Sequence, residues 1–364
     1  MSSRIRRSKR RQQTNLIVNI IFCLMTLTAL TICIVLVLQN YGLRNQTKET
    51  IAQLQEYEKQ QEGYVYTQAD VDYMIEEAVT SANENERAAV LAELKEKMSN
   101  GGTTADMLRS FFPENIVVYS DAQYYFFPIS ETLKKHNYVY DNFILQENEE
   151  VVYVDDTQEV LSIKGIDVSK YQGNIDWEKV ADDGVSYAFI RAGYRGNSNG
   201  KLMEDEFFKA NIEGAIENNI DTGVYFYTQA VTVEEAIEEA EMVLELIEPY
   251  DITYPVVLDL EEVDSDQART SEMTQQEYTD AAIAFCNRIK DAGYTPMIYG
   301  NLKTFMIMLD MNQLEGYDKW FAYYNTPVYF PYEFDIWQYS AKGTVAGIKG
   351  DVDMNIQMKK YGGE

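Results

Sequence analysis

Apolar and polar residues alternate along the second half of the chain in a pattern typical of short buried strands separated by helices. Three stretches have helical spacing of their apolar residues and run over Glu204–Asn219, Val233–Ile247 and Gln275–Ala292. The strand-like runs are "KGIDVS", "YAFIRAGY", "TGVYFYT", "YPVVLDLEE", "TPMIYGN", "KWFAYYN", "FDIWQYS" and "DVDMNIQ".

The order of these elements predicts an α/β domain over residues 164–364. Helices separate the first five strands, and after Tyr299 the spacers shorten. We therefore expect an irregular, TIM-like barrel of the (β/α)5β3 type. About 200 residues are enough to bury a sizeable core.

An uncharged run of 23 residues, Leu16–Leu38, precedes this domain and is long enough to span a bilayer. A cleavable signal peptide is the alternative, but its apolar core is shorter, about 7–15 residues. Residues 1–15 carry six basic side chains and no acidic one. We expect a retained single-pass anchor over 16–38, with a cytoplasmic N-terminal tail and the rest of the chain outside the cell.

Residues 39–105 are polar and favour helices, with a thin apolar stripe that is interrupted near Glu62–Tyr66. Thr67–Asp70 resembles a capping box. The stripe indicates either a stalk that self-associates as a short coiled coil or a monomeric, partly frayed helix pair. Both interpretations stay open because heptads are not sustained. "SNGGTT" (Ser99–Thr104) predicts a flexible joint at the end of this region.

Residues 106–163 change character, since aromatic and β-branched residues alternate with polar ones in "ENIVVYSDAQYYFFPI" and "EEVVYVDDTQEVLSI". We expect short strands in a small α+β spacer module. Its aromatic side chains either fill a core or stack on sugars.

Charge and rare residues narrow the function. The net charge of the chain is −28, and it is more negative still when the basic residues of the N-terminal tail are left out. Such a strongly acidic surface excludes nucleic acid as a partner. The three cysteines form no zinc motif and no disulfide framework, which fits a bacterial surface protein. His136 is the only histidine and precedes the predicted barrel. The barrel therefore has no Ser-His-Asp triad, Cys-His pair or HExxH zinc site, and its chemistry has to use carboxylates, Tyr, Lys or Arg. We expect no metal and no cofactor.

Carboxylates stand near the expected mouth of the barrel, where parallel barrels place their catalytic residues. Asp167 ends the first predicted strand, Asp259 and Glu261 end the fourth, and Asp353 lies on the last. Two acids at i and i+2 of a strand face the same side, with Cα atoms about 6.5–7 Å apart. Their mutual repulsion separates their pKa values, so one is suited to act as a general acid and the other to stay ionised.

Such an acid pair is the requirement of glycoside hydrolysis. In a chain this acidic, an isolated Asp-x-Glu is also typical of surface or capping acids, and only its place after an apolar strand and the missing histidines favour chemistry. Glu262 points to the opposite face and is expected to have no catalytic role.

The motifs "GIDVSKYQGNIDW", "FIRAGY", "GVYFYT", "PVVLDLEE", "IYGN" and "DIWQYS…GIKGDVDMN", in this order and spacing, resemble glycoside hydrolase family 25. The resemblance covers residues 164 to about 358. It implies a muramidase (lysozyme) that cuts the β-1,4 bond between N-acetylmuramic acid and N-acetylglucosamine of peptidoglycan, in an envelope of the Gram-positive kind.

The resemblance also implies roles for the acids. Glu261 matches the proton donor, Asp259 the group that stabilises charge at the anomeric centre, and Asp167 and Asp353 their partners from the first and last strands. The family is expected to retain configuration, with either a carboxylate or the substrate's acetamido oxygen as nucleophile. We favour the acetamido group, oriented by Asp259.

Aromatic residues near the mouth are candidates for a sugar-binding floor, although each is also a candidate for barrel packing. One departure from the family stands out: Tyr225-Phe226-Tyr227 and Ala322-Tyr323-Tyr324 lack the histidines that many members carry there. A non-catalytic glycan-binding or scaffold protein of a membrane complex is the alternative function. The candidate substrate-binding residues are Tyr194, Tyr225, Tyr227, Tyr324, Trp337 and Gln338.

Overall fold

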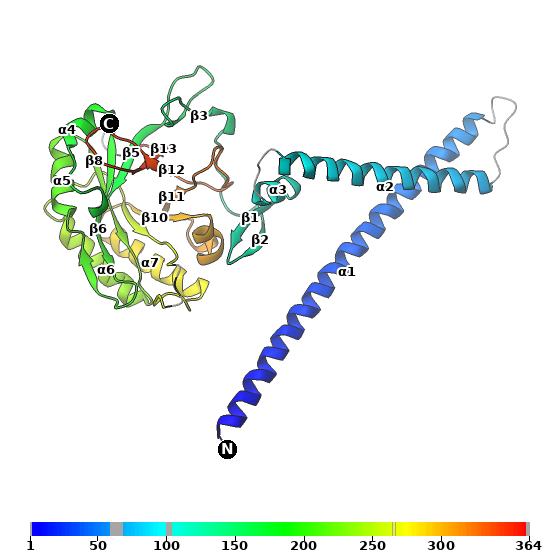
Figure 1. Cartoon of the computed structure of the whole chain (residues 1–364), viewed down its shortest axis with the longest axis horizontal. Coiled ribbons are helices and arrows are strands. Elements are labelled where there is room, and N and C mark those ends of the chain that lie inside the picture. The colour runs from blue at the N-terminus through cyan, green and yellow to red at the C-terminus, as the bar shows by residue number, and fades with distance from the viewer. Residues whose placement is uncertain (1, 59–67, 100–103, 264, 266, 362–364) are drawn as a thin grey trace. The chain divides into compact units, whose positions relative to one another are not determined.

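The computed structural model describes residues 2–58, 68–99, 104–263, 265 and 267–361 (Figure 1). The chain divides into two compact units, Met1–Gly102 and Thr103–Glu364. The predicted interruption at Glu62–Tyr66, the capping residue Thr67 and most of the predicted joint lie outside the described residues.

The first unit consists of two long helices, α1 (Ser2–Glu58) and α2 (Gln68–Ser99). The segment Cys23–Gln53 of α1 is long and apolar enough to cross a membrane, and none of its most apolar part is buried against the rest of the structure. On α2, Val71, Ile75 and Val79 are less exposed than their neighbours, as the predicted apolar stripe requires.

The second unit contains a closed barrel of eight strands in which each barrel strand pairs with the next along the chain, and β13 pairs with β5 to close the ring. This confirms the predicted irregular barrel. The short strand β7 (Leu202–Glu204) extends the sheet from β6. The barrel strands are β5 (Ile163–Val168), β6 (Tyr187–Arg195), β8 (Asp221–Tyr227), β9 (Val256–Asp259), β10 (Pro296–Asn301), β11 (Asp318–Ala322), β12 (Ile336–Gly343) and β13 (Val352–Gln357).

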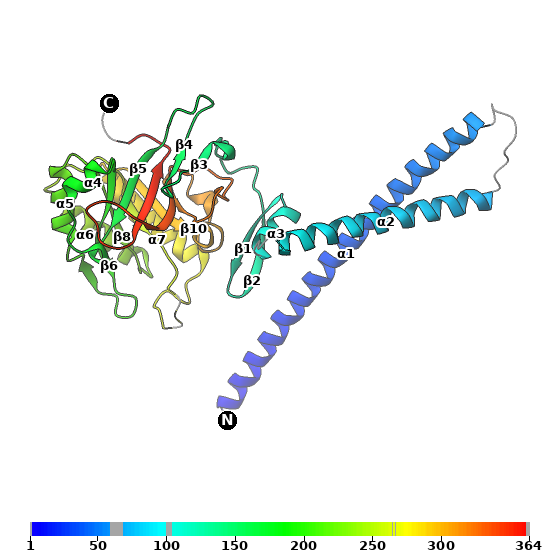
Figure 2. The same cartoon turned by 45° about the horizontal axis from the view of Figure 1, so that its top comes forward.

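The last strand runs against the others. Neighbouring barrel strands from β5 to β12 are parallel, whereas β13 is antiparallel to both β12 and β5, and the added strand β7 is antiparallel to β6. Figure 2 shows β13, in red, beside β5, in green. The start of β13 therefore lies at the same end of the barrel as the carboxyl ends of the parallel strands.

Helices cover the barrel where the spacers are long. The predicted bounds of Val233–Ile247 are those of α6, which begins at the side-chain cap of Thr232. A capping box of Thr274 and Glu277 starts α7. The helix expected from Glu204 begins later because Leu202–Glu204 pairs with β6. The helices are α4 (Trp177–Asp182), α5 (Phe208–Glu217), α6 (Val233–Ile247) and α7 (Gln275–Asp291), with a π-helical turn over Thr304–Met308 and a 3-10 turn over Met311–Gln313.

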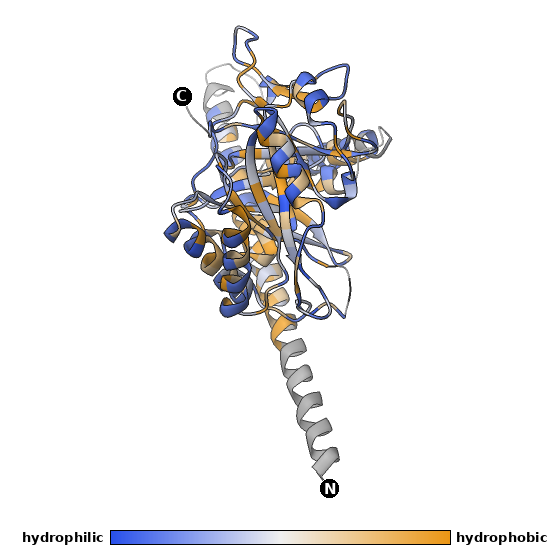
Figure 3. Cartoon of the chain, turned by 90° about the vertical axis from the view of Figure 1, so that its left-hand side faces the viewer, coloured by the Kyte–Doolittle hydropathy of each residue, from blue (hydrophilic) through white to orange (hydrophobic). Residues whose placement is uncertain are grey.

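Apolar side chains form two layers, one inside the barrel and one between its strands and the surrounding segments. Figure 3 shows apolar residues, in orange, concentrated on the strands, and polar residues, in blue, on the outer helices and loops. On β12, Ile336 belongs to the inner layer and Trp337 to the outer one. This alternation decides which predicted site residues reach the mouth.

Residues 106–163, expected as a separate spacer module, share the outer layer of the barrel core through Ile116, Val118, Phe143 and Val151. The region holds helix α3 and two hairpins, too little to bury a core of its own. Its elements are α3 (Thr104–Phe111), the hairpin β1 (Asn115–Ser120) and β2 (Gln123–Pro128), a 3-10 turn over Tyr140–Asn142, and the hairpin β3 (Phe143–Leu145) and β4 (Val151–Tyr153).

Candidate active site

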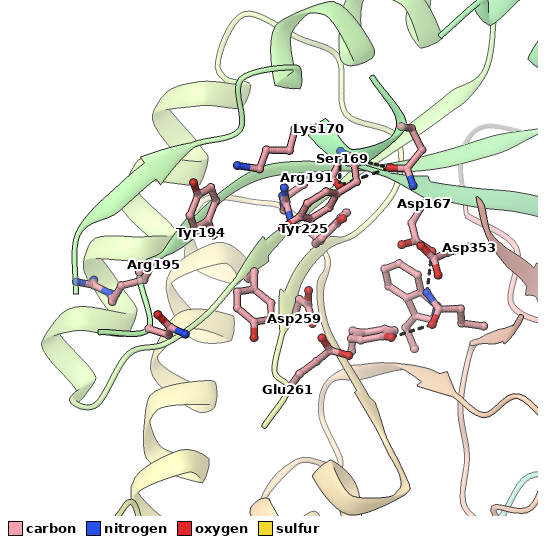
Figure 4. Close-up of a pocket in the computed structure, with 18 of the residues that line it drawn as sticks. Asp167, Ser169, Lys170, Arg191, Tyr194, Arg195, Tyr225, Asp259, Glu261 and Asp353 are labelled. Atoms are coloured by element: carbon pink, nitrogen blue, oxygen red, sulfur yellow. Dashed lines mark hydrogen bonds between the residues drawn. The ribbon is translucent and has the colours of Figure 1, made fainter. Parts of the chain in front are cut away.

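A cavity of about 530 Å³ opens at the barrel mouth and collects four acids from three strands or strand ends. In Figure 4, Asp167 and Asp353 lie side by side, and Asp259 and Glu261 lie next to each other. The structure thus brings together all four predicted carboxylates. The other predicted residues that line the cavity are Tyr194, Tyr225, Tyr227, Tyr324 and Gln338.

The chain around Glu261 is fixed although it is not regular strand. β9 ends at Asp259, earlier than the predicted run. The N–H of Leu260 still donates to Tyr299 O at 3.2 Å, and the buried hydroxyl of Thr304 donates to Leu260 O at 3.1 Å. These two bonds hold the residue between Asp259 and Glu261, so both side chains keep facing the cavity.

Glu262 lies on the other side of this loop and lines a different cavity. Its carboxylate forms an ion pair with Lys303 Nζ, which also contacts Asp121 Oδ2 at 3.2 Å. Glu262 points away from the acids as expected. Because it helps to anchor the loop that carries Glu261, it is not an inert neighbour.

Two amide side chains support Asp167. Gln338 Nε2 and Asn355 Nδ2 each donate to Asp167 Oδ2 at 2.8 Å. The orientation of both amides is set by other donors, because the Tyr299 and Tyr324 hydroxyls donate to Gln338 Oε1 and the Trp320 indole donates to Asn355 Oδ1. The amide hydrogens must therefore face the carboxylate, which favours its charged form.

Asp353 reaches the mouth from a strand that runs the opposite way. It is the second residue of β13 and pairs in register with Asp167 of β5. The prediction that every acid stands at the carboxyl end of its strand is therefore wrong for Asp353. The reversed direction of β13 brings its beginning to the mouth.

Burial raises the pKa values of all four acids. Burial and then repulsion from Asp353 raise the pKa of Asp167, against its two amide hydrogen bonds. Burial and then Glu261 raise the pKa of Asp259 well above its usual range, and burial raises the pKa of Asp353 to about 6. Burial and then Asp353 raise the pKa of Glu261. The raised pKa values favour proton retention in the site to a higher pH than for ordinary carboxyl groups, as a general acid requires.

One cation opposes this accumulation of negative charge. Arg191 lowers the pKa of Asp259, and its guanidinium contacts the fully buried Asp205 at 2.7 Å. Asp205 also accepts from the N–H of Lys170 at 3.1 Å. The acid partner of Arg191 is thus Asp205, a residue outside the predicted set, and their pair braces the loop after β5.

Comparison with known proteins places this geometry in a family. Residues 166–348 match glycosyl hydrolases family 25. The chain belongs to that family. It is similar to lysozyme M1 of Streptomyces globisporus, with 30% identity over 207 residues, 53% of this chain and 67% of the relative. It is also similar to protein YegX of Escherichia coli K12, with 29% identity over 203 residues, 54% of this chain and 69% of the relative.

Among solved structures, the autolysin LytC of Streptococcus pneumoniae in complex with a synthetic peptidoglycan ligand is similar at a TM-score of 0.50 and 25% identity. The match covers 66% of this chain and 57% of LytC. This chain therefore spans little more than half the length of that autolysin.

The family 25 site contradicts one prediction. Trp337 is fully buried in the outer layer, where its ring contacts Phe143 at 5.1 Å and its indole donates to Tyr323 O. It cannot form part of a sugar-binding floor. Gln338, the next residue, faces inward. Consecutive residues of a strand point to opposite faces, so Trp337 and Gln338 cannot both line the cavity. The tryptophan that lines the cavity is Trp320 of β11.

Trp320, Asn355 and Tyr299 also contribute to the family 25 site and were absent from the predicted set. Side chains alternate between the two faces of a strand, so residues an even number of positions apart face the same side. Trp320 is four residues before Tyr324, and Asn355 is two residues after Asp353, so this alternation predicts that both face inward. Tyr299, in the quoted motif "IYGN", lines the cavity beside Glu261. Within the described part of the chain, no group of three His, Cys, Asp or Glu side chains is arranged to hold a metal ion.

Proposed function

We propose that this chain is a membrane-tethered peptidoglycan hydrolase that cleaves the β-1,4 bond between N-acetylmuramic acid and N-acetylglucosamine during cell-wall remodelling. The observation that carries the proposal is the convergence of Asp167, Asp259, Glu261 and Asp353 in one cavity of a family 25 barrel. The named relatives include a lysozyme and an autolysin with a peptidoglycan ligand.

Glu261 acts as the general acid in this proposal. Its raised pKa keeps a proton available near neutral pH, and the fixed backbone of Leu260 aims the side chain into the cavity. Protonating the glycosidic oxygen allows the bond to the anomeric carbon to break, and Glu261 then deprotonates the attacking water.

Asp259 orients the substrate's own acetamido group as the nucleophile, so that cleavage retains configuration. Its Oδ1 is buried and accepts no hydrogen bond from the described protein groups. An acetamido N–H donated to this atom would favour the charged carboxylate and make the acetamido oxygen more nucleophilic. Asp167, whose charged form is favoured by its amide donors, and Asp353 stabilise the positive charge that develops on the sugar.

Tyrosines and Trp320 form the walls against which the sugars stack. Tyr194, Tyr225 and Tyr227 line one side of the cavity and the half-exposed Tyr324 stands at its edge. Tyr225-Phe226-Tyr227 and Ala322-Tyr323-Tyr324 lack the family histidines, and of these residues Tyr225, Tyr227 and Tyr324 line the cavity. We propose that hydroxyl groups replace imidazoles in the contacts to the sugar.

The tether fits the same task. The apolar part of α1 anchors the chain in the cell membrane of a Gram-positive bacterium, with the basic tail in the cytoplasm and the barrel facing the wall. A fully helical α2 of 32 residues adds about 48 Å of reach at 1.5 Å per residue. Self-association through this helical region remains part of the proposal.

A zymogram on purified cell wall tests the activity. Glu261→Gln retains the shape of the side chain but cannot donate the proton, so clearing should fall about 10²–10⁴-fold. Glu248→Gln removes an exposed acid at the end of α6 and serves as the control. The new reducing end should be N-acetylmuramic acid. Clearing by Glu261→Gln at the wild-type rate would contradict the mechanism.

The alternative, a non-catalytic glycan-binding protein, predicts retention on cell wall without new reducing ends in the wild type. Inhibition then tests the nucleophile. A thiazoline analogue of the sugar mimics the acetamido-derived intermediate and should inhibit strongly. An inert thiazoline together with a trapped glycosyl ester on Asp259 would instead assign the nucleophile to the carboxylate.

A further inference from the structure

The aromatic residues of the β1–β2 hairpin are divided between two faces. Tyr125 and Phe127 pack on the barrel core together with Ile116 and Val118 of the opposite strand. The other face carries Tyr119 directly opposite Tyr124, and Phe126 two residues further along β2. The sequence left open whether the aromatic residues of this region fill a core or stack on sugars. In this hairpin one face packs on the core, and the other face is available for stacking.

The second face is open to solvent over the outer part of the hairpin. Tyr119 is 56% exposed and Phe126 41%, and Phe112 at the end of α3 is 38% exposed. The rings form two contacts, Tyr119 with Tyr124 at 4.8 Å and Phe112 with Phe126 at 4.9 Å. We call these four residues, Phe112, Tyr119, Tyr124 and Phe126, the aromatic strip.

The tip of the hairpin contacts the segment that follows Glu261 and lines the same cavity as Glu262, next to that loop. Asp121, in the turn between β1 and β2, contacts Lys303, and Lys303 pairs with Glu262, the residue after the proposed acid. Ser120 supports the turn by donating to Asp121 Oδ2 at 2.9 Å. This bridge connects the loop of Glu261 with the strand that carries Tyr119. A polymer that continued from the catalytic cavity past Glu261 into the cavity of Glu262 would reach the tip of the hairpin.

We propose that the aromatic strip is an accessory binding surface for the glycan strand beyond the catalytic cavity. The inference rests on the proposed function, since it names where the same substrate continues. A cavity of about 530 Å³ holds a few sugar rings, whereas peptidoglycan strands are polymers. Flat aromatic faces match the apolar face of a pyranose, and the tyrosine hydroxyls can bond its rim.

The strip is a property of this chain rather than of the family barrel. All four residues precede residue 166, where the match to family 25 begins. The bridge gives the strip a defined place relative to the cavity, because Lys303 is only 17% exposed and contacts both Asp121 and Glu262. The occupant is therefore a strand already held in the cavity, and a second copy of the chain is the competing outcome.

The test compares a short and a long substrate with the full chain in detergent. The double variant Tyr119→Ala/Phe126→Ala removes two exposed rings, and Tyr73→Ala, which removes a 67%-exposed ring from α2, is the matched control. We expect KM for intact glycan strands to rise about tenfold with kcat unchanged. Cleavage of a muropeptide tetrasaccharide that fits the cavity should stay at the wild-type rate, as should both reactions of Tyr73→Ala.

Retention on purified cell wall in the Glu261→Gln background isolates binding from catalysis, and the two rings should again account for about tenfold. Tyr119→Phe, which keeps the ring, should restore retention when compared with Tyr119→Ala. A double variant that treats long strands as the wild type does would overturn the inference, even if the tetrasaccharide is still cleaved. If the wild-type chain cleaves neither substrate but the double variant is retained less well on cell wall, the result would support the strip and refute the catalytic proposal. A change in oligomeric mass without a change in retention would assign the strip to a second copy.

Discussion

Asn355 donates a hydrogen bond to Asp167 at 2.8 Å, and the Trp320 indole determines which end of the amide makes that bond. A tryptophan on β11 thereby controls the protonation of a carboxylate on β5 through an asparagine on β13. The three residues are buried inside the barrel. In this arrangement the amide hydrogen bonds favour the charged form of an acid, against burial and Asp353, which raise its pKa well above its usual range.

Replacing Asn355 by Leu should shift the pH dependence of hydrolysis. The substitution keeps the volume but removes one of the two donors to Asp167, so the pKa of Asp167 rises further. A charge-assisted hydrogen bond is worth about 1.5–3 kcal/mol, which corresponds to about one to two pH units. The acidic limb of kcat/KM against pH should move to higher pH by that amount, and kcat at neutral pH should fall.

Asn211→Leu provides the control for this change. Asn211 is as buried as Asn355 but lies in α5, away from the cavity. Its replacement should alter stability without moving the pH profile. A profile for Asn355→Leu that coincides with the wild type would show that the charge on Asp167 is not required.

Asp353→Asn should increase stability while it removes activity. Burial raises the pKa of Asp353 to about 6 in the folded chain, against 3.8 for an unperturbed aspartate. The folded state thus binds this proton more tightly than the unfolded state does, and ionisation costs stability as pH rises from about 4 to 6. A difference of about two units corresponds to at most about 3 kcal/mol at neutral pH.

Thermal unfolding at a series of pH values measures this effect. The gain of Asp353→Asn should be full above pH 6 and should fade toward pH 4. Asp351→Asn, which removes an exposed charge two residues earlier, should change the unfolding temperature little at any pH. A loss of stability for Asp353→Asn at neutral pH would mean that the carboxylate is stabilised by contacts other than those described.

Local patterns predicted the barrel and its acids well because they depend on neighbouring residues. Thr232 and the acidic first turn fix the start of α6, and apolar runs mark the strands. Asp259 and Glu261 were predicted to share a face and do line one cavity. The role of each acid, and the domain boundaries proposed for residues 1–15, 16–38, 39–105, 106–163 and 164–364, remain predictions.

The errors and omissions come from two different causes. Trp337 was misassigned although strict alternation with Gln338 already excluded it from the inner face. The contacts of Asn355 with Trp320, of Asp205 with Arg191 and of Lys303 with Asp121 join segments far apart in the sequence, and no local pattern encodes which buried donor meets which acceptor. The direction of β13 was missed for the same reason, because strand pairing is a tertiary property.

Arg195→Met should destabilise the barrel strongly. Arg195 Nε contacts Glu239 Oε1 at 2.7 Å, and both side chains are almost fully buried. Removing the arginine leaves a buried carboxylate without its cation, which typically costs about 3–5 kcal/mol. Arg288→Met breaks the pair with Glu241, an exposed acid, and should cost less than about 1 kcal/mol.

Urea unfolding of both variants measures the difference. Because the penalty lies in the unpaired charge rather than in the lost attraction, Arg195→Met/Glu239→Leu should recover much of the stability of the single variant. Equal costs for Arg195→Met and Arg288→Met would indicate that water reaches Glu239 in the folded barrel.

Protease added to protoplasts should remove the barrel and leave a membrane-embedded fragment that contains the apolar part of α1. The basic residues of the first 15 positions precede this segment, and positive charge is retained on the cytoplasmic side. Replacing Arg4, Arg6, Arg7, Lys9, Arg10 and Arg11 by Gln should weaken this bias, so that the barrel becomes protected from the protease in a fraction of the molecules. If the barrel of the wild-type chain were fully protected from the protease, it would lie in the cytoplasm, where it could not reach the wall. Release of the intact barrel into the medium without added protease would instead indicate that the apolar segment is cleaved as a signal peptide. Orientation and activity are thus tested by separate measurements, since a detergent-solubilised chain can clear cell wall whatever its topology.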